Sequence, residues 1–146
     1  MLALLMKISY TRIFPGRFDS LAHIAEFVIQ AAECAGLDDR ETYALQLAVD
    51  EACSNIIQHA YGGEDQGEIE CTYHITDTGL TVMLRDYGRP FDPSAIPDPE
   101  MPTDLDTCTG GGLGLYFMRQ LMDEVHFEFT PDSGNILTMT KRKETD

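Results

Sequence analysis

One stretch of the sequence, residues 45–61 (LQLAVDEACSNIIQHAY), restricts the fold more than any other. At about 100° per residue its apolar side chains fall on a single stripe, which is the pattern of a helix packed against a core. The members of this stripe are Leu45, Val49, Ala52, Cys53, Ile56 and Ala60. We therefore expect a helix that opens at Asp38 and Asp39, runs to about Tyr61 and ends at Gly62.

Three polar residues, Glu51, Asn55 and His59, recur at every fourth position along the border of this stripe. That spacing puts their side chains on one edge of the helix. Asparagine is a poor helix former and gains little in mid-helix unless its amide has a partner. The row is therefore predicted to be a contact site. A solvated flank with the same spacing is the alternative that this helix alone leaves open.

The rest of the chain supplies strands and two further helices. Alternating residues predict strands over 8–14, 67–76, 80–85, 125–129 and 136–140. Apolar spacing predicts a helix over 21–35, capped by Ser20 and stopped by Gly36, and another that opens within Gly110–Leu115 and runs to Met122. This element set indicates an α+β two-layer sandwich, with a mixed, mostly antiparallel sheet and helices on one face. At 146 residues one domain is expected, with its core over about 8–142.

Charge and cysteine content exclude several classes of protein. Ten Lys and Arg residues against 25 Asp and Glu residues give a net charge of −15, which repels nucleic acid and anionic lipid. We expect neither as a direct partner. The cysteines Cys34, Cys53, Cys71 and Cys108 form no CxxC pair and are typical of reduced thiols in a cytoplasmic protein. The apolar opening MLALLM is short and lacks a basic leader, so neither a signal peptide nor a membrane span is expected.

A carboxylate follows the second strand of the predicted hairpin. Asp86 leaves the apolar segment LTVMLR and precedes Gly88, so a ligand can approach the backbone closely there. A carboxylate at a strand end can accept a hydrogen bond from an exocyclic amine such as that of adenine. An ordinary Asp-x-Gly turn is the alternative for this motif in isolation.

Four glycines, Gly110, Gly111, Gly112 and Gly114, surround the start of the last helix. Each glycine near a helix start costs up to about 1 kcal/mol relative to alanine, without an evident packing return. A glycine-rich turn that feeds a helix exposes backbone N–H groups and the positive end of the helix dipole, which favour an anion. The segment lacks the pattern of a P-loop or a dinucleotide fingerprint. It can also serve as a hinge for the proline-rich segment 90–110, which has the character of a lid.

The order of these motifs resembles the Bergerat-fold ATP-binding domains shared by gyrase, the Hsp90 chaperone, histidine kinases and MutL. The segments LAVDEACSNIIQHAY, DYGRPFDP, GGGLGLYFMRQLMDEV and GNILTMTK are similar to the branch of anti-sigma factor serine kinases in particular. The resemblance covers about residues 8–142.

The resemblance implies a set of site residues. Asn55 would bind the Mg²⁺ that bridges the ATP phosphates, and Glu51 would be the general base for an attacking serine hydroxyl. Asp86 would hold the adenine amine, and Gly88 would admit the base. The segment Gly110, Gly111, Gly112, Leu113 and Gly114 would wrap the phosphates, and His59 would act in support.

Two features depart from the family pattern. Asn135 follows Gly134 where relatives often place threonine beside the adenine, so its amide would have to substitute. Between Arg89 and Arg119 the chain has no Lys or Arg, and the acidic residues there are Asp92, Asp98, Glu100, Asp104 and Asp106. Charge on a departing γ-phosphoryl group therefore has no cationic partner in this loop.

Three functions follow as expectations. The first is an ATP- and Mg²⁺-binding anti-sigma factor that works by partner switching. It phosphorylates a STAS-type anti-anti-sigma antagonist, and it holds a sigma factor or another target until the unphosphorylated antagonist competes for its surface. The second is a nucleotide-binding switch of the same kind without kinase activity. The third is a stand-alone ATP-binding domain of a histidine kinase system. Members of the branch commonly form homodimers, and the sequence does not decide this.

Overall fold

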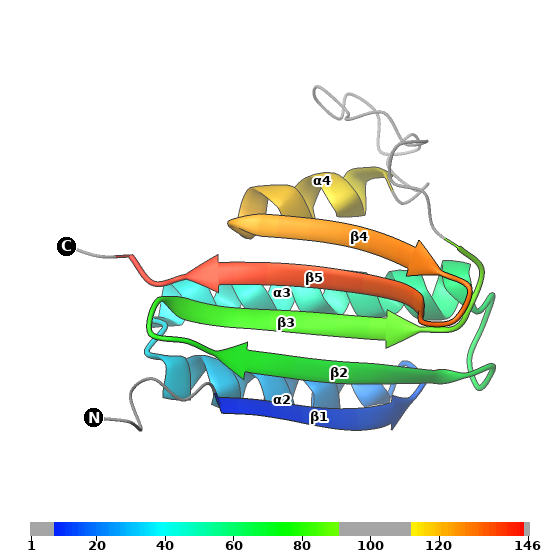
Figure 1. Ribbon diagram of the computed structural model, residues 1–146, viewed down its shortest axis with the longest axis horizontal. Helices are drawn as coiled ribbons and strands as arrows, with labels where there is room; N and C mark the ends of the chain where they lie inside the picture. The colour runs from blue at the N-terminus through cyan, green and yellow to red at the C-terminus, as the bar shows by residue number, and fades with distance from the viewer. Residues whose placement is uncertain (1–7, 91–111, 145–146) are drawn as a thin grey trace.

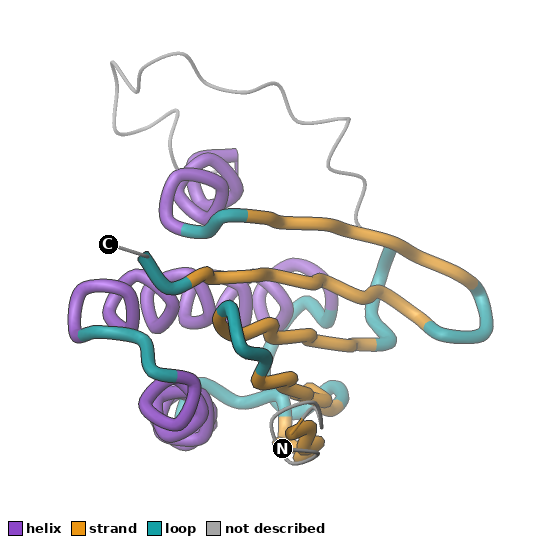
Figure 2. Tube along the Cα trace, turned by 60° about the vertical axis from the view of Figure 1, so that its left-hand side comes forward, coloured by secondary structure: helices purple, strands orange, loops and turns teal. Residues whose placement is uncertain are grey.

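The structure, a computed structural model, describes residues 8–90 and 112–144. These residues form a five-stranded sheet covered on one face by three α-helices (Figure 1, Figure 2). The strands are β1 (Ile8–Pro15), β2 (Glu68–Ile75), β3 (Gly79–Asp86), β4 (Glu124–Thr130) and β5 (Gly134–Arg142). The helices are α2 (Ser20–Ala35), α3 (Asp39–Asn55) and α4 (Gly112–Leu121), and the π-helical turn η1 (Ile56–Ala60) extends α3. The expected α+β two-layer sandwich is confirmed.

The sheet has the order β1-β2-β3-β5-β4, and each neighbouring pair is antiparallel. The expectation of a mixed sheet is therefore wrong for the strands that the structure describes. Two short hairpins, β2–β3 and β4–β5, explain the direction of four strands, since a hairpin joins antiparallel neighbours. α4 and β4 lie between β3 and β5 in the chain, and β5 returns to pair with β3.

Different hydrogen bonds hold the starts of α2 and α3. The Oδ1 atom of Asp38 accepts a hydrogen bond from the Glu41 N–H, and Glu41 Oε1 accepts one from the Asp38 N–H, both at 2.8 Å. This capping box fixes the predicted start of α3. The expectation that Ser20 caps α2 is wrong, because Ser20 is its first helical residue and its hydroxyl donates to the Pro15 carbonyl at 2.7 Å. The predicted stop at Gly36 is confirmed, with φ of 84° and an N–H that donates to Glu33.

The core lies between the sheet and the helices. The stripe predicted from α3 is buried there, since Leu45, Val49 and Cys53 have no exposed surface. Its later members, Ala52 and Ile56, are also buried, and Ala60 is half-buried. Residues from β2, β3, β5 and α4 pack against them, among them Ile69, Val82, Leu84, Leu115, Met118 and Met139. Burial of each large side chain stabilises the fold by roughly 1.5–3 kcal/mol.

The end of β3, the end of α3 and the start of α4 lie at the same end of the sandwich. Asp86, the last residue of β3, pairs with Asn135 at the start of β5. α4 begins near the end of α3 and runs back beside it (Figure 1). The Asp86–Asn135 pair of the sheet, the end of α3 and the start of α4 are therefore close together. None of the described helices is long and apolar enough to cross a membrane.

Candidate functional site

The carboxylate of Asp86 is held by the strand beside it. Asp86 is 4% exposed, and its Oδ1 atom accepts hydrogen bonds from Asn135 Nδ2 and from the Gly88 N–H, each at 2.9 Å. Burial raises the pKa of Asp86, while the bonds from Asn135 and Gly88 act in the opposite direction. Among the described residues, Oδ2 has no hydrogen-bond partner. The Asp-x-Gly turn thus presents one carboxylate oxygen for a further donor.

The amide of Asn135 also holds the backbone of Gly88 and Arg89. Asn135 Nδ2 also donates to the Arg89 carbonyl at 2.9 Å and to the Gly88 carbonyl at 3.3 Å. The Asn135 side chain is thus a hydrogen-bond partner of Asp86. It fixes both the carboxylate and the turn that follows β3.

Gly88 lies directly against the end of the helix. A Cβ atom at this position would overlap the carbonyl group of Ala60, so only glycine fits without a backbone shift. The Arg89 N–H donates to that carbonyl at 2.8 Å, and Arg89 Nη2 donates to the His59 carbonyl at 3.0 Å. Two carbonyls that a helix end leaves without intrahelical partners are therefore satisfied by one arginine.

The end of the long helix is a π-helical turn, which the sequence pattern did not predict. α3 keeps α-helical geometry to Asn55, and the turn Ile56–Ala60 then closes with a bond from the Tyr61 N–H to the Ile56 carbonyl at 2.9 Å. A π turn widens the helix and frees carbonyls for other donors. It therefore shifts His59 from the straight row predicted with Glu51 and Asn55.

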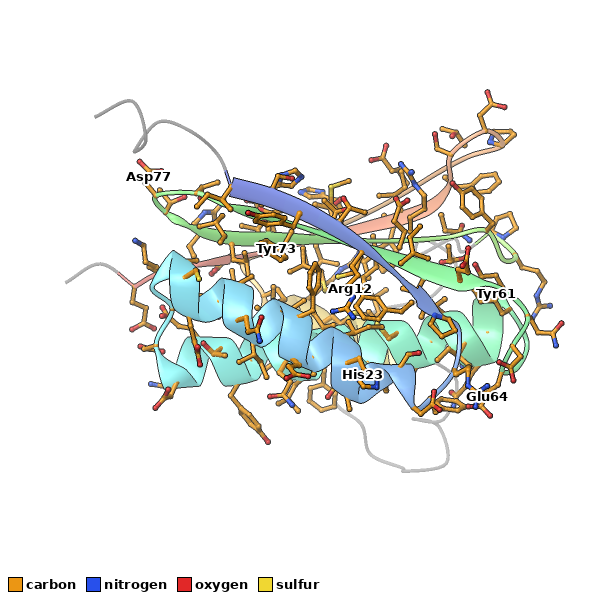
Figure 3. The ribbon with its side chains drawn as sticks, turned by 90° about the horizontal axis from the view of Figure 1, so that it is seen from below. Arg12, His23, Tyr61, Glu64, Tyr73 and Asp77 are labelled. Atoms are coloured by element: carbon orange, nitrogen blue, oxygen red, sulfur yellow. The ribbon has the colours of Figure 1, made fainter. Side chains whose placement is uncertain are left out.

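Tyr61 connects this turn to the strands. Its hydroxyl donates to the Glu68 carbonyl at 2.6 Å and accepts a bond from the Tyr87 N–H at 3.0 Å. The ring lies where a Cβ atom of Gly67 would stand. Figure 3 shows Tyr61 at the same end of the molecule as Glu64, with Asp77 of the β2–β3 turn at the other end. The tyrosine therefore braces the Asp86–Gly88 turn from the side of β2.

A cavity of about 340 Å³ opens beside these contacts. α3 and η1 form one wall, α4 and the sheet the other, and the turn after β3 closes one side. The apolar lining residues are Ala52, Ile56, Ala60, Pro90, Leu115, Met118, Phe127 and Leu137, and the polar ones are Asn55, His59 and Arg89. Ligand pockets commonly combine such an apolar wall with a few polar groups.

The structure brings some of the predicted site residues together and leaves others apart. Asn55 and His59 line the cavity, whereas Asp86 and Gly88 are not lining residues and precede the lining residue Arg89 in the chain. Glu51 is half-buried one helical turn before Asn55 and is not a lining residue. Gly112, Leu113 and Gly114 form the first turn of α4, next to the lining residue Leu115. Gly110, Gly111 and most of the predicted lid lie outside the described residues.

Sequence reasoning missed several residues of the cavity wall. Phe127 and Leu137 are register partners on β4 and β5, so their inward direction follows only from the strand pairing. Arg89 was noted only as the border of a segment without basic residues. Its place directly after the Asp-x-Gly turn was the available signal.

Comparison with known proteins shows the family to which this chain belongs. The family model described as histidine kinase-like ATPase domain matches residues 14–141. Serine-protein kinase RsbW of Bacillus velezensis is 40% identical over 101 residues, which cover 66% of this chain and 62% of that protein. Proteins of the same name from Listeria innocua and Bacillus cereus are 37% identical over 114 residues and 35% identical over 128 residues. These alignments cover 75% and 80% of this chain, and 71% and 78% of those proteins. The chain therefore belongs to the family of histidine kinase-like ATPase domains.

Proposed function

We propose that this protein binds ATP with Mg²⁺ and acts as an anti-sigma regulatory factor with serine protein kinase activity. Its proposed substrate is a STAS-type antagonist, and its other partner is a sigma factor or a similar regulated protein. The cavity of about 340 Å³ carries the proposal, because its apolar wall suits a purine base and its polar residues suit phosphates. The name serine-protein kinase, borne by relatives such as the one from Bacillus cereus, supports the reaction class.

The residues present fit the two parts of this ligand. Asn55 is half-buried, and its amide has no hydrogen-bond partner among the described residues, so its oxygen can bind a hard cation such as Mg²⁺. The Oδ2 atom of Asp86 can accept the exocyclic amine of adenine, since Oδ1 is already engaged. Gly112, Leu113 and Gly114 offer backbone N–H groups at the start of α4, as an anion requires.

Glu51 is the proposed general base. Its half-buried carboxylate lies one turn from Asn55 and has no described partner that would compete for a proton. A serine oxygen of the antagonist forms a bond to the γ-phosphorus while the bond to the β–γ bridging oxygen breaks. ADP leaves, and the serine proton passes to Glu51. Bound ATP supplies the phosphoryl group.

A nucleotide-binding switch without kinase activity is the second candidate. The acidic composition of the segment between Arg89 and Arg119 favours it, because such a segment supplies no positive charge to a transferred phosphoryl group. In either form the proposed setting is a single-domain protein of the cytoplasm. A homodimer is compatible with both.

Two measurements test the proposal. Thermal unfolding with ATP and Mg²⁺ should show added stability that EDTA removes, and ligand at 100 times its Kd adds about 2.7 kcal/mol. Labelled ATP with a cognate STAS antagonist should then label a serine of that antagonist. We expect Glu51→Gln to lose the transfer and keep ATP binding, while Glu26→Gln, an exposed site on α2, keeps both. Binding without transfer in the unaltered protein would select the switch, and no binding would reject both candidates.

A further inference from the structure

The wall of the cavity includes one arginine that is fixed at three points. The Arg89 N–H donates to the Ala60 carbonyl at 2.8 Å, and its carbonyl accepts from Asn135 Nδ2 at 2.9 Å. Its Nη2 atom donates to the His59 carbonyl at 3.0 Å. Both backbone groups and one end of the side chain are thus held by the same elements that form the site.

The guanidinium group of Arg89 also keeps its charge available. A guanidinium carries five N–H donors, and only the bond from Nη2 to His59 uses one of them among the described residues. Other arginines of this acidic chain pair with carboxylates, namely Arg17 with Asp19 and Asp65, Arg85 with Glu70 and Arg142 with Glu124. Arg89 forms no such pair in the part of the chain that the structure describes.

The position of this charge matches the needs of a phosphorylated ligand. Arg89 is the one Lys or Arg among the residues that line the described cavity, and Asn55 borders the same space from α3. An arginine held in place before the ligand arrives loses little conformational freedom on binding, and its planar donors suit phosphate oxygens. The sequence showed only that the segment after Arg89 is acidic and has no Lys or Arg before Arg119.

We propose that Arg89 binds the phosphate groups of the nucleotide and supplies the positive charge that the acidic segment lacks. This inference rests on the proposed function. It assigns to Arg89 a contact with the ligand, rather than a role confined to bracing η1 through the His59 carbonyl.

The test compares ligands that share a base and differ in phosphate. Affinities for ATP with Mg²⁺ and for adenosine are measured by calorimetry for the unaltered protein and for Arg89→Gln. We expect the variant to bind ATP about 10- to 100-fold more weakly, because a charge-assisted contact is lost, and to bind adenosine within about twofold of the unaltered protein. Arg40→Gln removes the same charge from an exposed position at the far end of α3 and should leave both affinities unchanged.

Each other outcome has a defined meaning. Equal weakening of ATP and adenosine would overturn the inference, since Arg89 would then only support the shape of the cavity. Unchanged ATP affinity in Arg89→Gln would overturn it as well. If thermal unfolding shows that Arg89→Gln does not fold, Arg89→Met, which keeps the aliphatic part of the side chain, carries the same comparison. Failure of the unaltered protein to bind ATP rejects the proposed function itself and is seen before any variant is made.

Discussion

Replacing Asp86 with asparagine should stabilise the protein and weaken its proposed binding of ATP. Asp86→Asn keeps an oxygen that can accept from Asn135 and Gly88, so both bonds to Oδ1 survive. The raised pKa of Asp86 means that burial outweighs these bonds and that the charged form is disfavoured in the folded state. A neutral isostere removes this penalty. We therefore expect the free energy of unfolding at pH 7 to be higher for Asp86→Asn than for the unaltered protein.

The pH dependence gives the sign of this effect. Because the folded pKa of Asp86 lies above the ordinary value of 3.8, the folded protein binds the proton more tightly than the unfolded chain does. The stability contributed by this group therefore falls as the pH rises from 3.8 through the folded pKa. It stays low at neutral pH. The advantage of Asp86→Asn should accordingly be full at pH 7 and should disappear on acidification to below 3.8.

Binding should change in the opposite direction. The asparagine would turn an N–H₂ group, in place of Oδ2, towards the adenine amine, and two donors would then face each other. We expect ATP affinity to fall by about 2–3 kcal/mol, or roughly 30- to 150-fold in Kd. Denaturant unfolding at pH 7 and at a pH below 3.8 measures the effect on stability, and calorimetric titration with ATP measures the effect on binding.

Asp50→Asn is the matched control. Burial also raises the pKa of Asp50, which is half-buried on α3 and, unlike Asp86, has no proposed contact with the nucleotide. This variant should gain stability at pH 7 while ATP affinity stays unchanged. Loss of stability in Asp86→Asn, with a gain in Asp50→Asn, would refute the argument that burial dominates at Asp86. Undiminished ATP affinity in Asp86→Asn would refute its contact with the base.

Two further variants test how the turn after β3 is held. Tyr61→Phe removes the hydrogen bonds to the Glu68 carbonyl and from the Tyr87 N–H. It should lower the free energy of unfolding, measured by urea denaturation, by about 1–3 kcal/mol. An unchanged unfolding midpoint would mean that water replaces both bonds. Gly88→Ala places a methyl group against the Ala60 carbonyl and should both destabilise the fold and weaken ATP binding. Gly63→Ala is the comparison, because a methyl group there meets no atom within 4 Å and the variant tests only the cost of backbone strain at a φ of 150°.

The helices and strands were predictable because their signals are local. The apolar stripe of α3 and the capping residues Asp38 and Glu41 are encoded within a few turns. The turn glycine Gly36 is equally local. Ser20 was assigned wrongly because its hydroxyl can accept from the helix or donate elsewhere, and the Pro15 carbonyl, set by the path of β1, decides between them.

The candidate site was predictable only in part. The positions of Asn55 and His59 beside the cavity followed from helical spacing, and the setting of Asp86 followed from its strand. The π turn could not be predicted from helical spacing, because its carbonyls accept hydrogen bonds from Arg89, which lies 30 residues after His59. The strand pairing that carries Phe127 and Leu137 to the cavity is a long-range property as well. The roles assigned to Glu51, Asn55 and the glycines stay predictions.

An acidic chain can hold a triphosphate only if charge is balanced close to the ligand. At physiological ionic strength the Debye length is about 8 Å, so most of the net charge of −15 is screened at the cavity, and the groups in contact with the ligand decide. Under the proposed function, the groups near the cavity that would meet the phosphates are the amide of Asn55, the guanidinium of Arg89 and the positive end of α4, whose first residue is Gly112. The bond from Arg89 to η1 links the cation to the helix that carries Asn55. Any change that straightens the π turn should therefore move both together and weaken phosphate binding more than base binding.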